Sequence, residues 1–162
     1  MESNKDIENC CHYFNMEKIT KEYIEKLFNR YNEEYFKGEL RCKKFGTFFT
    51  HIESGDHILG KCFCEGKKSK IWISSNALWD EESLKDVMLH EMIHLYNAEI
   101  LGKADTFPFF HGKRFRRKMR EMEKEYGIKV KRVSEVYIKK EKVPSTWIGK
   151  KMRHIKLVTG IF

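Results

Sequence analysis

Residues 81–101 read Glu-Glu-Ser-Leu-Lys-Asp-Val-Met-Leu-His-Glu-Met-Ile-His-Leu-Tyr-Asn-Ala-Glu-Ile-Leu, which is the most informative stretch of the chain. It predicts a helix with Asp80 as its N-cap and Gly102 just beyond its end. Its apolar residues cover almost every azimuth, which is typical of a helix inside a domain. His90, Glu91 and His94 therefore fall in an apolar surround, where groups that can carry charge or bind a ligand need a partner.

Residues 90–94, His-Glu-Met-Ile-His, have the spacing of a zinc site. On a helix, positions i and i+4 lie about 40° apart in azimuth and one turn apart in height, so both imidazoles point the same way. Glu91 lies one step to the side, from where its carboxylate can reach a water on the metal rather than the metal itself. The alternative is a pair of core histidines that are satisfied by hydrogen bonds.

A catalytic zinc site needs a third protein ligand and leaves one position open for water. The metzincin pattern would need Gly and then His where this chain has Asn97 and Ile100, so that class is excluded. A glutamate ligand from a second helix, about twenty residues downstream, would fall within residues 113–117, which contain no acid. The candidate that the sequence offers is His111, seventeen residues after His94.

The flanking segments predict an α+β domain around this helix. A first helix is expected from the N-cap Thr20 to about residue 36. Three short segments rich in aromatic or β-branched residues, separated by turn residues, predict an antiparallel meander over 45–52, 58–64 and 70–74. Later elements are expected as a helix over 113–126 and strands over 129–138, 147–149 and 154–162. The expected fold is a single domain with three main helices, a small antiparallel sheet and C-terminal strands.

The two histidine-containing segments resemble the signature of a known protein family. His90-Glu91-Met92-Ile93-His94, followed by His111-Gly112-Lys113-Arg114-Phe115, resembles the HExxH…HGxxF signature of SprT-like, or Spartan-type, zinc metalloprotease domains. Residues 27–40 resemble the opening helix of that family, and residues 59–62 and 71–74 resemble its central strands. The resemblance covers about residues 20–127 and implies a zincin-like fold.

The resemblance also implies a site and an activity. It implies one zinc ion per chain, bound by His90, His94 and His111, with Glu91 as the general base of peptide hydrolysis through a metal-activated water. It further implies proteolysis coupled to nucleic acid, because the best-known relatives degrade proteins crosslinked to DNA. The alternative is a metal-stabilised nucleic-acid-binding module with little or no proteolytic turnover.

The charge of the chain is distributed unevenly. Residues 111–162 carry 17 Lys or Arg against 5 Asp or Glu, whereas the net charge of all 162 residues is +8. Such an asymmetry favours a polyanionic partner, most often nucleic acid, and the alternative is a solvated surface. The candidate nucleic-acid contacts are Arg114, Arg116, Arg117, Lys118, Arg120, Lys150, Lys151 and Arg153.

Composition sets the remaining expectations. The chain has 41% hydrophobic residues, enough for one core, and no stretch long and apolar enough to span a membrane. Residues 1–6 lack the features of a secretory signal, and the five cysteines are expected to be reduced thiols in a cytoplasmic, nucleoid-associated or nuclear protein. Cys62 and Cys64 lack the spacing of a zinc knuckle and are expected to be small core residues. The expected parts are a lead-in over 1–15, a protease core over 16–127 and a basic extension of the same domain over 128–162.

Overall fold

The computed structural model of the chain describes residues 19–51, 58–65, 68–104, 111–131, 135–138 and 155–158. Its helices are α2 (Lys21–Phe36), α3 (Glu81–Glu99) and α4 (Lys113–Tyr126). Its strands are β1 (Lys44–Phe48), β2 (Gly60–Glu65), β3 (Lys68–Ser74), β4 (Ala77–Leu78), β5 (Glu135–Ile138) and β6 (Ile155–Val158). The predicted α+β fold with three main helices is confirmed.

The helices begin and end for the local reasons that the sequence predicts. Thr20 and Asp80, the two predicted N-caps, each accept a hydrogen bond from the backbone N–H three residues further on. α3 ends at Glu99 rather than at the predicted Leu101. α4 ends at the predicted Gly127, whose φ of 68° places it in the left-handed region that favours glycine.

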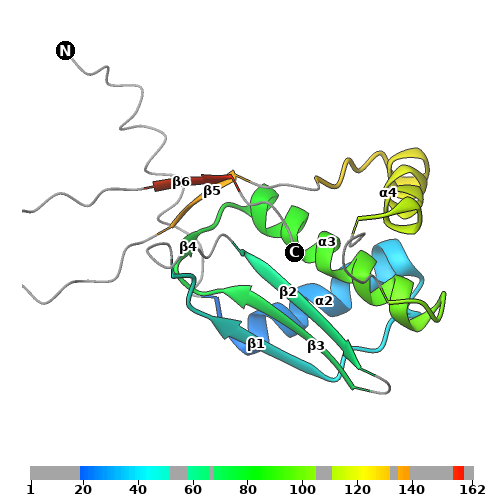
Figure 1. The fold of residues 1–162 in the computed structure, drawn as a ribbon, viewed down its shortest axis with the longest axis horizontal. Helices are drawn as coiled ribbons and strands as arrows, with labels where there is room; N and C mark the ends of the chain where they lie inside the picture. The colour runs from blue at the N-terminus through cyan, green and yellow to red at the C-terminus, as the bar shows by residue number, and fades with distance from the viewer. Residues whose placement is uncertain are drawn as a thin grey trace, which may run out of the picture.

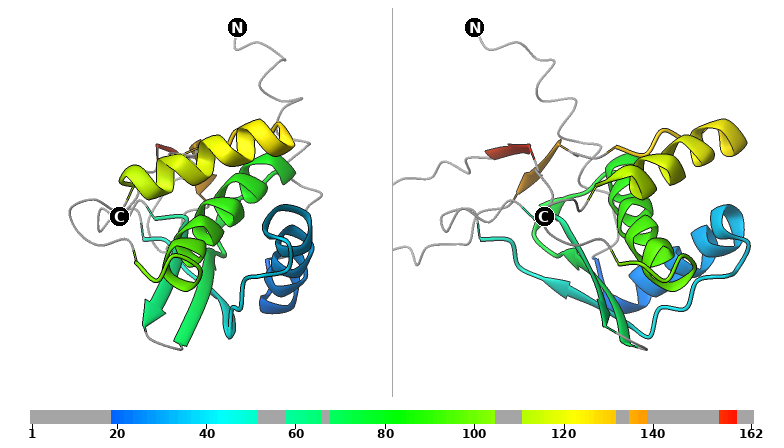
Figure 2. Two further views of the ribbon diagram at one scale, coloured as in Figure 1. Left: turned by 90° about the vertical axis from the view of Figure 1, so that its right-hand side faces the viewer. Right: turned by 45° about the vertical axis from the view of Figure 1, so that its right-hand side comes forward.

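α3 lies at the centre of the domain (Figures 1 and 2). It packs against β2 and β3, against α2, and against α4. As its apolar sequence predicts, most of its side chains are buried, and the buried polar residues are Asp86, His90, Glu91 and Asn97. The helix therefore carries its ligand-capable groups into the interior, between the sheet and α4.

The predicted antiparallel meander is wrong, because β3 and not β2 is the central strand. β2 pairs antiparallel with β3, whereas β1 pairs parallel with β3 and places Phe45 opposite Ile71. The sheet is therefore mixed, in the order β1-β3-β2. Burial agrees with this order, since Ile71 and Ile73 of β3 are fully buried and a central strand is the one most enclosed by its sheet. Hydrogen bonds that Thr50 and Asn76 exchange, at 2.9 and 3.0 Å, hold the chain after β1 beside the end of β3.

A second, antiparallel sheet has the order β4-β5-β6. β5 and β6 lie within the strands predicted over 129–138 and 154–162, but both are shorter than predicted. The predicted lead-in over 1–15 and the predicted strand over 147–149 lie outside the described residues. In the part of the chain that the structure describes, no helix combines the length and hydrophobicity that crossing a membrane requires.

Candidate metal centre

Three histidine side chains converge where α3 meets the start of α4. His90 and His94 lie one turn apart on α3, and His111 lies just before Gly112, the N-cap of α4. The Nε2 atom of His90 is 3.2 Å from that of His94 and 3.0 Å from that of His111. The Nε2 atoms of His94 and His111 are 3.2 Å apart. The structure thus brings together the two helical histidines and the more distant His111.

Hydrogen bonds alone cannot account for this triangle of nitrogen atoms. An imidazole nitrogen either carries a proton and donates, or carries a lone pair and accepts. Among three mutually close nitrogens, at least one pair must therefore be donor facing donor or acceptor facing acceptor. A cation bound by three lone pairs removes this conflict, so the arrangement suits a metal ion better than it suits hydrogen-bonded core histidines.

His90 is held in the form that a metal ligand requires. Its Nδ1 atom lies 3.1 Å from the backbone carbonyl oxygen of Lys131, so Nδ1 carries the proton and donates to that carbonyl. Its Nε2 atom is then left with a lone pair directed at His94 and His111. Burial, followed by the charges of those two histidines, holds the pKa of His90 well below its usual value and keeps the ring neutral.

Phe115 supports the three imidazole rings from α4. Its ring centroid lies 4.7 Å from the His90 ring, 4.7 Å from the His94 ring and 4.6 Å from the His111 ring. Phe115 itself is fully buried. Contact with one rigid aromatic ring restricts the rotation of all three ligand side chains, which favours a preorganised site.

The nitrogen positions fit a tetrahedral ion. With Zn–N bonds of about 2.0–2.1 Å, two ligand nitrogens in tetrahedral geometry lie roughly 3.3–3.4 Å apart. The observed separations of 3.0–3.2 Å are slightly shorter, as small ring movements would allow. Among the described residues, His90, His94 and His111 form the cluster whose ligand atoms all lie within 4.8 Å of one another, and this cluster can hold a metal ion.

Glu91 points from α3 toward β2 and is buried. A Cβ atom at Gly60 of β2 would lie 2.7 Å from its Oε1 atom and 2.8 Å from a methyl group of Val87, so only glycine allows this approach of strand and helix. In the metal-free chain, burial raises the pKa of Glu91 to about 7, against the smaller lowering effects of His94 and of a backbone hydrogen bond at Cys62. The chain thus places a carboxyl group that can hold or release a proton near neutral pH beside the histidine cluster.

A pocket of about 530 Å³ lies between α3 and β2. Glu91 and His94 line it from the helix, and residues 60–65 line it along the whole of β2. Among the described strands, β2 pairs only with β3, so its other edge faces no strand. Such an edge presents backbone N–H and C=O groups to a further extended chain. The pocket can therefore take a peptide segment next to Glu91.

Cys62 and Cys64 line the same pocket rather than lying fully in the core. Their sulfur atoms are 3.5 Å apart, and both side chains are partly buried. The neighbouring Cys64 thiol and burial raise the pKa of Cys62 well above its usual value, which keeps this thiol protonated near neutral pH.

A family model described as the SprT-like family matches residues 24–137, well over half of the chain. The chain belongs to the SprT-like family. SprT-like domains are zincin-like, metal-dependent and of the metalloprotease type, and the histidine cluster is where this SprT-like chain can hold its metal. A comparison with curated proteins found no match.

The basic side chains in the first part of α4 point in two different directions. Lys113, Arg114, Arg116, Arg117 and Arg120 surround one hollow of about 410 Å³ on this helix. Lys118 was predicted to belong to the same basic group, but its side chain points the other way, toward α2 and α3. Its ammonium lies 4.2 Å from the ring centroid of Tyr96 and 5.3 Å from that of Phe36. The predicted contacts at Lys150, Lys151 and Arg153 lie outside the described residues.

Sequence reasoning missed several residues that shape the site. Lys131 acts through its backbone carbonyl, a group that every residue has, so no sequence signal could reveal it. Gly60 lies within a predicted strand, and an isolated glycine in a strand often marks a place where another element approaches the backbone closely. The sequence therefore contained a signal for the close approach of α3 at this position. Lys113 adjoins the predicted basic residues in sequence, and Phe115 belongs to the quoted motif but carried no predicted role at the metal.

We expect Gly60→Ala to destabilise the domain, because the new methyl group would overlap Glu91 and Val87. Overpacking of this kind costs about 1–3 kcal/mol of unfolding free energy. Urea unfolding measures the change, with Glu65→Ala at the exposed end of the same strand as the control. Stability of Gly60→Ala within about 0.5 kcal/mol of the original chain would contradict the close approach of β2 to Glu91.

Proposed function

We propose that the chain is a zinc-dependent metalloendopeptidase that hydrolyses peptide bonds in proteins associated with DNA. The main support for this proposal is the buried Glu91 carboxyl group, which lines the same pocket as His94 of the histidine cluster. A purely structural metal site has no use for a buried acid beside its ligands, whereas hydrolysis needs a group that accepts a proton from water.

Zinc fits the donor set, because three neutral imidazoles with one open position are a known catalytic arrangement for this ion. His90, His94 and His111 would hold it through their Nε2 atoms. When bound, the zinc ion would supply a Lewis acid that lowers the pKa of water toward about 7 and polarises a carbonyl group.

The remaining chemistry belongs to the side chains of the protein. Glu91 takes a proton from the attacking water at its carboxylate and delivers that proton to the leaving amine. The edge of β2 binds the substrate as an added antiparallel strand, which places the peptide bond along the pocket beside Glu91 and His94. Because backbone groups make this contact, we expect weak sequence preference and a requirement for an extended, locally unfolded substrate.

The experiment that tests the proposal is cleavage of an unstructured protein such as reduced casein. The zinc-loaded chain is expected to cleave it at internal bonds, and removal of zinc with a chelator is expected to stop cleavage. Zinc returned to the stripped protein should restore the activity. A zinc-loaded chain that binds DNA but cleaves no protein would favour the alternative, a metal-stabilised binding module.

The hollow on α4 supports the nucleic-acid part of the proposal. Five cationic side chains surround it, and of these Lys113, Arg116, Arg117 and Arg120 are exposed. Arg117 lies 3.5 Å from Glu121, an exposed ion pair that phosphate can replace at small cost. Because α4 starts only two residues after His111, a phosphate backbone bound here would lie beside the metal centre. Contacts of this kind give affinity without base readout.

We expect Arg116→Glu/Arg120→Glu to weaken DNA binding at least about tenfold in low salt. If each arginine contacts one phosphate, the slope of log affinity against log salt falls by about 1.8 for duplex DNA. Fluorescence anisotropy with labelled single-stranded and duplex DNA measures both quantities. The matched control is Lys21→Glu/Lys26→Glu, which makes the same charge change on exposed positions of α2. Equal losses in the two variants would show that total charge, and not the α4 hollow, determines binding.

A further inference from the structure

The segment after α4 returns to α3 beside the metal centre. Val130 is buried, with 2% of its surface exposed, and the next residue is Lys131. The carbonyl oxygen of Lys131 accepts the hydrogen bond from Nδ1 of His90 at 3.1 Å. A residue 41 positions away in sequence thus sets the tautomer of this histidine. The position of that carbonyl depends on how the segment is attached to α3.

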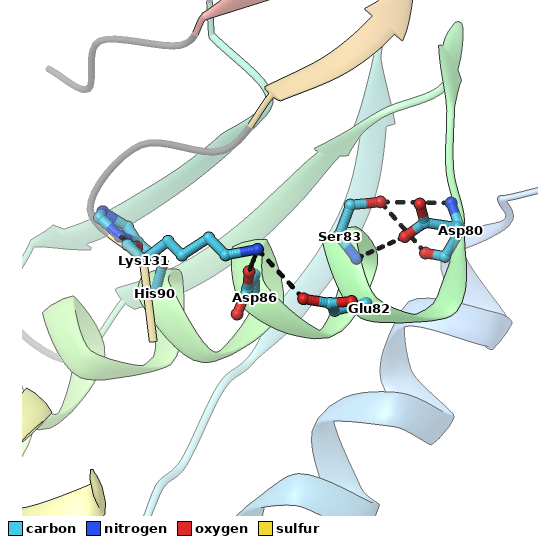
Figure 3. A network of polar contacts seen from close by, with 6 residues as sticks. All are labelled: Asp80, Glu82, Ser83, Asp86, His90 and Lys131. Carbon is cyan, nitrogen blue, oxygen red and sulfur yellow. Dashed lines mark hydrogen bonds and ion pairs between the residues drawn. The ribbon is translucent and has the colours of Figure 1, made fainter. Parts of the chain in front are cut away.

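The side chain of Lys131 provides the attachment. Figure 3 shows it running along α3, away from His90 and toward the start of the helix. Its ammonium lies 3.1 Å from Oδ2 of Asp86 and 3.1 Å from Oε1 of Glu82. Glu82, Asp86 and His90 are spaced four residues apart, so they form one stripe along the helix. Lys131 contacts this stripe at both ends, with its ammonium and with its backbone carbonyl.

Glu82 and Asp86 contribute unequally to holding the Lys131 side chain. The side chain of Glu82 is 81% exposed, and ion pairs of this kind add little. That of Asp86 is only 9% exposed. Burial raises the pKa of Asp86, and the Lys131 ammonium beside it acts against that rise. A buried carboxylate without a partner is costly, so the pair between Asp86 and Lys131 is the strong attachment.

We propose that Lys131 is a positioning residue for the metal centre, with its ion pair to Asp86 holding its carbonyl against Nδ1 of His90. The carbonyl keeps the proton on Nδ1 and thereby directs the lone pair of Nε2 toward the ion. Partners of this kind orient the ligand ring and raise its basicity. The inference rests on the metal site of the proposed function, but it does not depend on proteolysis.

The test compares variants that separate the charge pair from the backbone carbonyl. Lys131→Met keeps the carbonyl and most of the side-chain stem but removes the ammonium. Lys131→Arg restores a cation, and Glu82→Gln removes only the exposed partner. The double variant Asp86→Asn/Lys131→Met removes both charges, so that no unpaired carboxylate is left buried if Lys131→Met alone does not fold.

Two readouts are needed, and neither is activity. The first is zinc affinity, measured by competition with a chromogenic chelator. We expect it to fall about 10–100-fold in Lys131→Met and in the double variant, and to stay within about threefold in Lys131→Arg and Glu82→Gln. The second is the Nδ1–H signal of His90 in nitrogen-15 NMR of the metal-free protein, which we expect to be lost in Lys131→Met and in the double variant.

A folded double variant with unchanged zinc affinity and an unchanged Nδ1–H signal would overturn the inference, since the pair would then serve only the stability of the fold. Failure of the original chain to bind zinc would refute the metal site of the proposed function. In that case the NMR signal of the metal-free protein would still decide whether the Asp86–Lys131 pair positions His90.

Discussion

Glu91→Gln is expected to abolish cleavage while leaving zinc in place. Glutamine has nearly the same shape as glutamate, so it fits the space between α3 and Gly60, but it cannot accept and return a proton. Loss of a general base lowers the rate of the chemical step by about 10²–10⁴-fold. Digestion of reduced casein at equal zinc loading measures the rate, and elemental analysis of the purified variant measures the zinc content.

The matched control for this variant is Glu81→Gln, which makes the same chemical change at an exposed position on the first turn of the same helix. It should cleave at the original rate. The proposed mechanism would be contradicted if the zinc-loaded Glu91→Gln chain kept more than about a tenth of the original activity. Loss of zinc from Glu91→Gln would instead give the carboxyl group a role in holding the metal.

His111→Ala is expected to lose most of the affinity for zinc. The substitution removes one of the three nitrogen ligands and leaves only His90 and His94, which lie four residues apart on α3. Because loss of a partner outside the ligand set already costs 10–100-fold, loss of a ligand should weaken binding by at least about 100-fold. Chelator competition gives the affinity, and elemental analysis after dialysis gives the retained zinc.

His51→Ala is the control for this second variant, because His51 is exposed and does not belong to the cluster. It should keep one zinc ion per chain. Circular dichroism of the metal-free His111→Ala chain checks that the loss is local, since the three helices should remain. Full zinc occupancy without His111 would overturn the three-histidine site and with it the proposed role of the HGxxF segment.

Local structure followed closely from the sequence. The N-caps at Thr20 and Asp80 and the stop at Gly127 depend on residues within one turn, and all three were predicted correctly. The apolar character of α3 likewise predicted its buried position, because burial of a helix on every side requires apolar residues on every side. The pairing of His90 and His94 needs only helical geometry.

The order of the strands did not follow from the sequence. The three segments of the main sheet have similar lengths and compositions, and turn residues separate them in a way that also suits a meander. The tertiary structure places β3, with its buried Ile71 and Ile73, between β1 and β2. Among the described strands, this arrangement leaves β2 at the edge of the sheet, where it lines the pocket beside Glu91.

The direction of a basic side chain was likewise decided by tertiary contacts. The sequence groups Lys118 with the arginines of α4, but its ammonium lies over the ring of Tyr96 on α3. Burial lowers the pKa of Lys118, which fits a side chain that is partly withdrawn from solvent. Helical periodicity places residues on a face, whereas the neighbouring helix determines which of them remain available to a partner.

The three helices, the paired histidines with an adjacent acid on a buried helix, and the basic character of the last third were all predictable from the amino-acid sequence. These features arise from interactions over a few residues, or from composition. Three contacts needed the folded structure: the triangle of nitrogens at 3.0–3.2 Å that His111 completes, the close approach of Gly60 to Glu91, and the hydrogen bond from His90 to the Lys131 carbonyl. Those contacts join residues 17 to 41 positions apart, and only the packing of the whole domain brings them together.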